Sequence, residues 1–265
     1  MTTLTERRRR FTELHRDGLF LMPNAWDVGS ARVLLSLGAV AIATTSSGHA
    51  ASLGKRDQQV TLDELLAHVA ALSSAVTIPL NVDAERCFAD DPEGVGRNVR
   101  LIAEAGAAGC SIEDYDPATG AIDDLASAVD RVSAAVAAAH EQGVVLTARA
   151  ENHLYGVADL DDTIDRLRAY RGAGADVVYA PGLVEPDHID RLVKAVDAPV
   201  NVLALRRTPP IGELARLGVR RISTGGGLAK AAYGAVVAAM RELQAEGTST
   251  YLDRAMPGSE LEAAM

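Results

Sequence analysis

The stretch "IPLNVDAERCFADDPEGVGRNVRLIAEAGAAGCSIED" at residues 78–114 contains the repeating unit from which the fold can be predicted. It begins with a β-like run over 78–85, and the aspartate-proline pair at 91–92 is a typical start of a helix. Gly106 stands where a glycine often ends a helix, and a second β-like run follows over 109–114. The stretch therefore predicts a strand, a helix and a second strand of one parallel sheet.

The same unit recurs along the whole chain. The β-like runs cover 19–22, 39–46, 78–85, 109–114, 144–151, 176–181, 199–204 and 219–224. The helical stretches between and after them cover 28–37, 61–74, 92–105, 123–141, 160–173, 185–195, 210–217 and 227–246. This alternation predicts a (β/α)8 barrel of the TIM type, as a single domain over residues 1–265. The main alternative, a doubly wound open sheet, should have a glycine-rich phosphate turn after an early strand, and "MPNAWD" at 22–27 is no such turn.

The composition and charge of the chain limit the partners and the cellular location that we expect for it. The chain has 265 residues, 48% of them hydrophobic, and a formal net charge of −10, which argues against nucleic acid as a partner. "RRRR" at 7–10 lies in a polar helical stretch, where a solvated or subunit-contacting face is expected. Cys87 and Cys110 suggest no disulfide framework, and no apolar run resembles a signal peptide or spans a membrane. We therefore expect a cytoplasmic protein without a membrane partner.

Polar side chains gather at the predicted carboxyl ends of the strands. Successive side chains of a strand point to opposite faces, so Asn81, Asp83 and Glu85 of the third strand are expected on one face. The other strand ends supply Ser46, Ser47 and Gly48 after the second strand, Ser111 and Glu113 of the fourth, Thr147, Arg149 and Glu151 of the fifth, and Asn201 of the seventh. Catalytic groups of a barrel lie at the carboxyl ends of its strands, so the sequence predicts one site at the barrel mouth.

The charges of this predicted site are unbalanced. Four carboxylates, those of Asp83, Glu85, Glu113 and Glu151, would accompany the single arginine Arg149. Unpaired buried charges are costly, so the remaining negative charge calls for a cation. Ligands that are all oxygens suit Mg²⁺ or Mn²⁺ rather than Zn²⁺. We therefore expect Asp83 and Glu85 to lie close together because they share a metal ion.

A second motif has two interpretations. "STGGG" at 223–227 lies between the last strand and its helix, where many barrels bind phosphate. The same residues are equally typical of a tight turn. A phosphate-dependent barrel and a barrel with a simple turn at this point therefore both remain open.

Several longer pieces, in their order and spacing, resemble one known group of proteins. These pieces are "MPNAWDVGSARVL", "TTSSGHAASLGKRD", "NVDAERCFADDPEGVGRNVRLIAEAGAAGCSIED", "TARAEN" and "NVLA". Over nearly its whole length the chain resembles the isocitrate lyase/phosphoenolpyruvate mutase superfamily. The resemblance implies a (β/α)8 barrel that binds Mg²⁺ near its third and fourth strands, together with a 2-oxo acid or its enolate.

The resemblance also implies roles for individual residues. Asp83 matches the acid that ligates the metal directly, and Glu85 and Glu113 match acids that act largely through metal-bound water. Ser47 and Gly48 match the cradle for the substrate carboxylate. Ser46, Asn201 and Glu151 are expected to contact the substrate because of their positions at the strand ends, not because of the resemblance. Asp57 of "GKRD" matches a loop aspartate near the reacting group, and Arg149 matches the arginine that contacts the oxo acid. Members are typically tetramers that exchange their last helix, a role that residues 227–265 could serve.

One departure from the family pattern bears on the substrate. Isocitrate and methylisocitrate lyases carry a "K-[KR]-C-G-H" segment whose cysteine acts as acid, whereas residues 114–124 here read "DYDPATGAIDD". The lysine and asparagine of the phosphonopyruvate branch are also missing there. We therefore expect little isocitrate or methylisocitrate cleavage, and Mg²⁺-dependent turnover of a small 2-oxo or 2-hydroxy acid, with oxaloacetate favoured. The alternatives are a phosphonopyruvate mutase or hydrolase, a methylisocitrate lyase-like enzyme, and a barrel that binds an oxo acid without catalysis.

Overall fold

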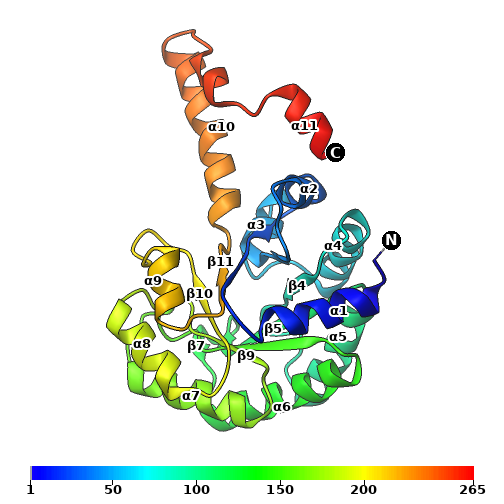
Figure 1. Cartoon of the computed structure of the whole chain (residues 1–265), viewed down its shortest axis with the longest axis vertical. Helices are drawn as coiled ribbons and strands as arrows, with labels where there is room; N and C mark the ends of the chain where they lie inside the picture. Colours follow the sequence, from blue (N-terminus) through cyan, green and yellow to red (C-terminus); the bar gives the residue numbers. More distant parts are fainter. Residues whose placement is uncertain (1) are drawn as a thin grey trace.

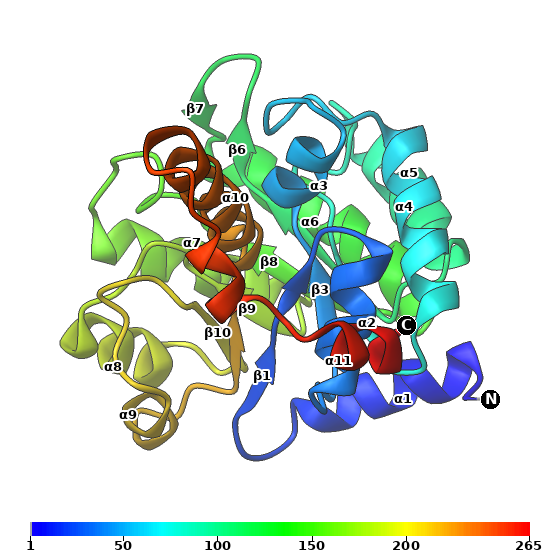
Figure 2. The ribbon, with the colours of Figure 1, turned by 90° about the horizontal axis from the view of Figure 1, so that it is seen from above.

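The computed structural model describes residues 2–265 and shows a ring of parallel strands surrounded by helices (Figure 1, Figure 2). The strands of this ring are β1 (Phe20–Met22), β2 (Asn24–Ala25), β3 (Ile42–Thr44), β4 (Leu80–Asp83), β5 (Gly109–Glu113), β8 (Val145–Arg149), β9 (Val177–Tyr179), β10 (Val200–Leu203) and β11 (Arg221–Ser223). Their order is β1-β11-β10-β9-β8-β5-β4-β3-β2, with every neighbouring pair parallel.

The first and last strands close the ring. β1 pairs with β11, with Phe20 opposite Arg221, whereas β2 pairs with β3, with Asn24 opposite Ala43. Pro23 separates β1 from β2, and a proline has no N–H for a sheet hydrogen bond. The predicted first strand is therefore split at Pro23 and its two halves bind the two flanking strands. This topology confirms the predicted (β/α)8 barrel, and the doubly wound alternative is wrong.

Helices surround the ring, and the last helical elements, from residue 227 onward, extend away from it. They are α1 (Leu4–Leu14), α2 (Val28–Ser36), α3 (Ser46–Ser52), α4 (Leu62–Ala75), α5 (Pro92–Glu104), α6 (Leu125–Glu141), α7 (Leu160–Gly172), α8 (Pro186–Ala195), α9 (Ile211–Arg216), α10 (Gly227–Ala245), the 3-10 turn η1 (Thr250–Arg254) and α11 (Gly258–Ala264). The core between strands and helices consists mostly of alanine, valine, leucine and isoleucine. Aromatic residues make up only 4% of the chain, so small and branched side chains fill the core by close packing.

The predicted helix starts are confirmed. The side chains of Asp27, Thr61 and Asp91 each accept a hydrogen bond from the backbone N–H three residues further on, at 2.6, 3.3 and 2.8 Å. Such caps satisfy N–H groups that have no partner inside the helix. At the other end of α5, Gly106 has a φ of +116°, and a Cβ there would lie 2.2 Å from Ser73 Oγ. Only glycine therefore fits that turn.

Several strands end earlier than the sequence predicts, which corrects the placement of site residues. β3 ends at Thr44, and Ser46 begins helix α3, because Thr45 caps that helix through its side chain. β4 ends at Asp83, and Glu85 lies in a turn with a φ of +50°. The prediction that Glu85 continues the strand face of Asp83 is therefore wrong. The two-residue period holds only as far as the backbone stays extended.

Half of the arginine run at 7–10 binds the barrel rather than solvent. Arg7 donates to the carbonyl oxygens of Ser73 and Val76, at 2.8 and 3.3 Å. Arg8 donates to three carbonyl oxygens, those of Ala103, Ala107 and Gln142, at 2.6 to 3.0 Å. These carbonyls lie at or just after the carboxyl ends of α4, α5 and α6, where the helix dipole favours a cation. The expected solvated face is correct for Arg9 and Arg10 and wrong for Arg7 and Arg8.

A polar layer fills the barrel below its mouth. Arg221 is 1% exposed and donates to Asn201 Oδ1 at 2.9 Å and Thr147 Oγ1 at 3.0 Å. Its Nη1 also lies 3.3 Å from His15 Nε2. Burial, together with the charge of Arg221, lowers the pKa of His15 to about 3, so that the neutral ring can accept this bond. Asn201 therefore lies toward the barrel axis and also binds the buried guanidinium of Arg221.

The carboxyl-terminal segment leaves the barrel. α10 projects outward from β11, and the chain then returns through η1 so that α11 lies beside α2 (Figure 1). Ala229 is the one buried residue of α10, whereas Val236, Val237 and Met240 are 61%, 47% and 48% exposed. Within residues 2–265, none of the helices combines the length and the apolar character needed to cross a membrane.

Candidate active site

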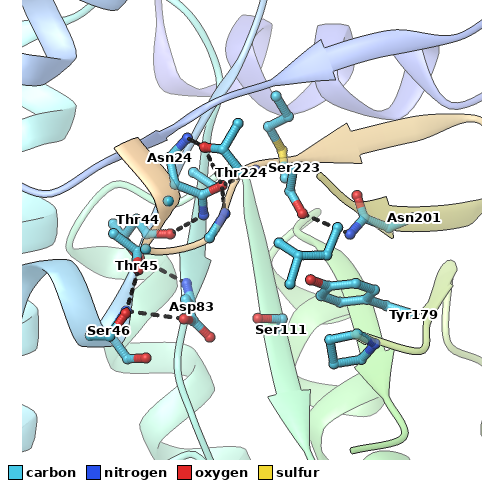
Figure 3. Close-up of a pocket in the computed structure, with 18 of the residues that line it drawn as sticks. Asn24, Thr44, Thr45, Ser46, Asp83, Ser111, Tyr179, Asn201, Ser223 and Thr224 are labelled. Atoms are coloured by element: carbon cyan, nitrogen blue, oxygen red, sulfur yellow. Dashed lines mark hydrogen bonds between the residues drawn. The ribbon is translucent and has the colours of Figure 1, made fainter. Parts of the chain in front are cut away.

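A cavity of about 340 Å³ opens at the carboxyl ends of the strands, where the sequence predicts the site (Figure 3). Of the predicted site residues it is lined by Ser46, Ser47, Asp57, Asp83, Ser111, Arg149 and Asn201. Tyr179, Ser223 and Thr224 add polar groups on the opposite wall, and Arg221 lies at the bottom. The cavity thus brings together residues from strands, helix α3 and loops that are far apart in the sequence.

Arg149 is the centre of the charged wall. Its Nη1 donates to Asp83 Oδ1 at 2.6 Å, and its Nε donates to Glu151 Oε1 at 2.7 Å. Its Nη2 lies 3.1 Å from Glu113 Oε2. Burial alone would lower the pKa of Arg149, but the charges of Glu151, Asp83 and Glu113 raise it well above its ordinary value. The guanidinium is therefore a fixed positive charge held by three carboxylates.

The wall carries more negative than positive charge. Asp57, Asp83, Glu85, Glu113 and Glu151 lie around Arg149, which among residues 2–265 is the one cation within ion-pair distance of any of them. Burial and the nearby charges of Asp83 and Asp57 raise the pKa of Glu85 to about 8. Burial also raises the pKa of Glu151 to about 7, against the lowering effect of Arg149. Burial is the main cause of both shifts, and the negative charges around Glu85 add to it.

The donor set fits a hard divalent cation. Asp83 faces the cavity and accepts a hydrogen bond from the backbone N–H of Ser46 through Oδ2, at 3.0 Å. Glu85 lines a separate cavity of about 10 Å³ directly behind Asp83. Within the described residues no three His, Cys, Asp or Glu side chains converge closely enough to form a metal shell by themselves. A cation at Asp83 would complete its shell with water, which is typical of Mg²⁺.

Glu113 and Glu151 lie behind Arg149. Glu113 is 5% exposed and accepts a hydrogen bond from Gln58 Nε2 through Oε1, at 2.9 Å. Glu151 is 1% exposed, contacts Arg149, and donates a hydrogen bond from its backbone N–H to Asp114 Oδ1, at 2.9 Å. Neither lines the cavity, so a direct contact of Glu151 with substrate stays a prediction. Gln58 is a site residue that sequence analysis missed, although it directly follows Asp57.

The turn from β3 into α3 forms another wall. The side-chain oxygens of Thr45 and Ser47 lie 3.3 Å apart, and Ser47 points toward Gly226 across the cavity. A Cβ on Gly48 would lie 2.6 Å from Thr45 Cγ2 and 3.0 Å from Trp26 Cβ, so the backbone can pack this closely only with glycine. Ser46 and Ser47 of this turn line the cavity, whereas Gly48 does not. The backbone N–H groups of Ser46 and Gly48 donate to Asp83 Oδ2 and Thr45 Oγ1, so the predicted carboxylate cradle stays a prediction.

The "STGGG" motif forms a tight turn. Asn24 Oδ1 accepts hydrogen bonds from the backbone N–H groups of Thr224 and Gly225, both at 2.8 Å (Figure 3). Two of the N–H groups that would hold a phosphate are thus bound within the protein. Sequence analysis missed Asn24, because nothing in "MPNAWD" marks a side chain that binds a loop 200 residues away.

A hairpin stands at the rim of the mouth. β6 (Tyr115–Asp116) and β7 (Ala121–Ile122) form it, and Tyr115 stacks on Tyr155 with ring centroids 3.5 Å apart. Just after the hairpin, Asp123 accepts hydrogen bonds from Arg86 Nη2 through both carboxylate oxygens, at 2.9 and 3.1 Å.

Both cysteines, Cys87 and Cys110, are fully buried, and neither lines the cavity. The mouth therefore lacks a cysteine acid.

Comparison with known proteins places this geometry in a family. The family model for phosphoenolpyruvate phosphomutase matches residues 11–244. An oxaloacetate decarboxylase of Bradyrhizobium sp. (strain BTAi1) is 30% identical to this chain, with 91% of this chain and 85% of that protein covered. A solved structure from Burkholderia cenocepacia J2315, assigned only to the broad class lyase/mutase, is 45% identical, with a TM-score of 0.94 and coverages of 98% and 95%. The structure of a 2,3-dimethylmalate lyase is 28% identical, with a TM-score of 0.84 and coverages of 100% and 94%.

Proposed function

Because the chain belongs to the phosphoenolpyruvate phosphomutase family, whose relatives include lyases and mutases, we propose that it is a Mg²⁺-dependent carbon–carbon lyase. It acts on a small 2-oxo acid through a pyruvate-like enolate, and oxaloacetate is the favoured substrate. The observation that carries this proposal is Arg149, a fixed guanidinium that lines the cavity beside Asp83. Positive charge placed in advance where an enolate oxygen develops is the main requirement of such a reaction.

The chain's own residues would divide the work as follows. Arg149 has five N–H groups; two donate to Asp83 and Glu151 and a third faces Glu113, which leaves two for an oxygen of the substrate. The first turn of α3 would hold the substrate carboxylate through Ser47 and the backbone beside it. Asp83, with Glu85 and Glu113 acting through water, would hold Mg²⁺. When bound, this ion would supply further positive charge to the enolate oxygen.

The proton balance favours decarboxylation. Cleavage of isocitrate must deliver a proton to the departing enolate product, and both cysteines are buried away from the cavity. Loss of CO₂ from oxaloacetate breaks one carbon–carbon bond and leaves the electron pair on the enolate, and CO₂ itself needs no proton. The enolate of pyruvate can then take its proton from water. The relative named oxaloacetate decarboxylase supports the same choice.

We expect Mg²⁺-dependent pyruvate release from oxaloacetate at a rate well above its spontaneous decay. Isocitrate and methylisocitrate should react little, because the mouth lacks a cysteine acid. The assay measures pyruvate from oxaloacetate, 2-methylisocitrate, 2,3-dimethylmalate and phosphonopyruvate, and glyoxylate from isocitrate, at one metal concentration, with Asp83→Ala as the inactive control. Rapid isocitrate cleavage with oxaloacetate untouched would overturn the proposal. Oxalate binding without turnover of any acid would indicate a binding protein instead.

We also propose that residues 227–265 mediate assembly of a homo-oligomer. The support is the apolar face of α10, with Val236 61% and Met240 48% exposed, on a helix that projects from its own barrel. Apolar surface of this extent is typical of an interface. Light scattering should give a multiple of the 27.8 kDa chain mass for the wild type, and a smaller particle for Val236→Glu combined with Met240→Glu. Arg241→Glu is the control on the same helix, and a monomeric wild type would contradict the assignment.

A further inference from the structure

The loop between α3 and α4 contains a backbone conformation that is unusual for its residue. The N–H of Gln59 donates to the carbonyl of Arg56 at 3.2 Å, which closes a four-residue turn with Asp57 and Gln58 at its centre. Gln58 has a φ of +65°. A side chain at positive φ crowds its own backbone, so this third position of a turn normally takes glycine or asparagine. The turn therefore stores strain at Gln58.

The side chain of Gln58 makes the long-range contact of this loop. Its Nε2 donates to Glu113 Oε1 at 2.9 Å, and Glu113 lies on β5, 55 residues away. Among the other side chains of residues 54–60, Lys55 binds Glu64 of α4, Gln59 binds within the turn, and Asp57 binds Ser46 at the start of α3. Within the described residues, the contact to Glu113 is the side-chain hydrogen bond that joins this loop to β5, across the barrel mouth.

Closure of this loop has two effects on the site. It fixes Glu113 on both oxygens, because Gln58 binds Oε1 while Arg149 lies 3.1 Å from Oε2. It also places the preceding residue, Asp57, on the wall of the cavity. Without this contact, Asp57 would keep only its hydrogen bond to Ser46, and Glu113 would keep only its contact with Arg149.

We propose that Gln58 is a positioning residue that latches the 54–60 loop shut over the active site. The hydrogen bond to Glu113 offsets the strain of the positive φ, so the loop is closed but easily opened. For catalysis this inference rests on the proposed function, in which Asp57 lies near the reacting group. The latch itself is a property of the loop and can be measured without any substrate.

The test compares two replacements of Gln58 that separate strain from contact. Gln58→Gly relieves the strain and removes the amide, whereas Gln58→Met keeps the length and the strain but also removes the amide. Gln59→Ala is the matched control, because Gln59 has the same side chain in the same turn and accepts a hydrogen bond only from the N–H of Arg56, at 3.3 Å. Loop opening is read as the rate of trypsin cleavage after Lys55 and Arg56, located by mass spectrometry, with and without oxalate and Mg²⁺.

We expect Gln58→Gly to unfold at the same temperature as the wild type or a higher one, and yet to be cut several times faster in the loop. Gln58→Met should be cut faster and also unfold at a lower temperature, and Gln59→Ala should behave like the wild type. With an active substrate, Gln58→Gly should lose roughly tenfold or more in kcat with KM changed less than about twofold, because Asp57 is misplaced rather than lost. A positioning role thus predicts lower activity in a variant that is no less stable.

Two results would overturn the proposal. One is a Gln58→Gly variant that is cut no faster than the wild type. The other is cleavage that increases throughout the chain in proportion to lost thermal stability, which would make Gln58 an ordinary structural residue. If the protein turns over none of the acids in the panel, the proposed function fails, but the cleavage and unfolding measurements still decide whether Gln58 is a latch.

Discussion

Replacement of Arg149 by lysine will leave the barrel folded and lower kcat/KM by roughly a hundredfold or more. Three different nitrogens of Arg149 face Asp83, Glu113 and Glu151, at 2.6, 3.1 and 2.7 Å. A lysine ammonium keeps the positive charge but has one nitrogen, so it cannot face three carboxylates and a substrate oxygen together. The loss should appear mainly in kcat, because the charge on the enolate oxygen develops only in the reaction.

A matched surface replacement controls for the general effect of exchanging arginine for lysine. Arg100 pairs with Glu141 at 2.8 Å, and its side chain is 46% exposed, so Arg100→Lys should have wild-type rates. Circular dichroism and urea unfolding establish that both variants are folded. A nearly wild-type rate in Arg149→Lys would mean that the arginine only balances the buried carboxylates and takes no part in the chemistry.

Removal of divalent cations with EDTA will abolish turnover and lower the unfolding temperature, and Mg²⁺ or Mn²⁺ will restore both. Five carboxyl groups surround Arg149, and burial together with the charges of Asp83 and Asp57 raises the pKa of Glu85 to about 8, so a bound cation would favour the ionised carboxylates. A cation that binds only the folded protein stabilises it by about 2.7 kcal/mol at a hundred times its Kd. Scanning calorimetry against metal concentration measures this shift without reference to any substrate.

Single substitutions will rank the acids of the metal site. Asp83 faces the cavity whereas Glu85 lies behind it, so Asp83→Ala should weaken metal binding and turnover more than Glu85→Ala. Glu93, an exposed acid in the first turn of α5, provides the control Glu93→Ala. Full activity in metal-free buffer would exclude the metal, and equal small losses in both site variants would make the acidic cluster merely structural.

Residues on strands were predictable, because a strand has a fixed period. Asp83 and Arg149 are the last residues of β4 and β8, and the two-residue alternation places both toward the barrel axis. Glu85 was misplaced because the chain turns at positive φ just after Asp83, and such a turn has no period that a pattern can reveal. Glu85 still lies close to Asp83, because the turn brings both residues to the wall of one small cavity.

Residues whose role depends on a distant partner were not predictable. Gln58 and Asn24 act through hydrogen bonds to residues 55 and 200 positions away, which only the folded chain defines. The same applies to Arg7 and Arg8, which look like a solvated charge run until the carbonyls at the ends of three helices are in place. A local signal such as the aspartate-proline pair at 91–92 was correct because cap and helix lie in the same few residues.

The pairing of β1 with β11 also has a consequence for synthesis on the ribosome. Phe20 of β1 is synthesised long before its pairing partner, Arg221 of β11. At a synthesis rate of 5 to 20 residues per second, β11 emerges roughly 10 to 40 s after β1. During that interval β1 and β10 both present unpaired edges, to which another nascent chain can add a strand. Pairing of β11, the last barrel strand, therefore ends the period in which this chain is exposed to misassembly. Translation that stalls before residue 221 leaves an open, aggregation-prone sheet.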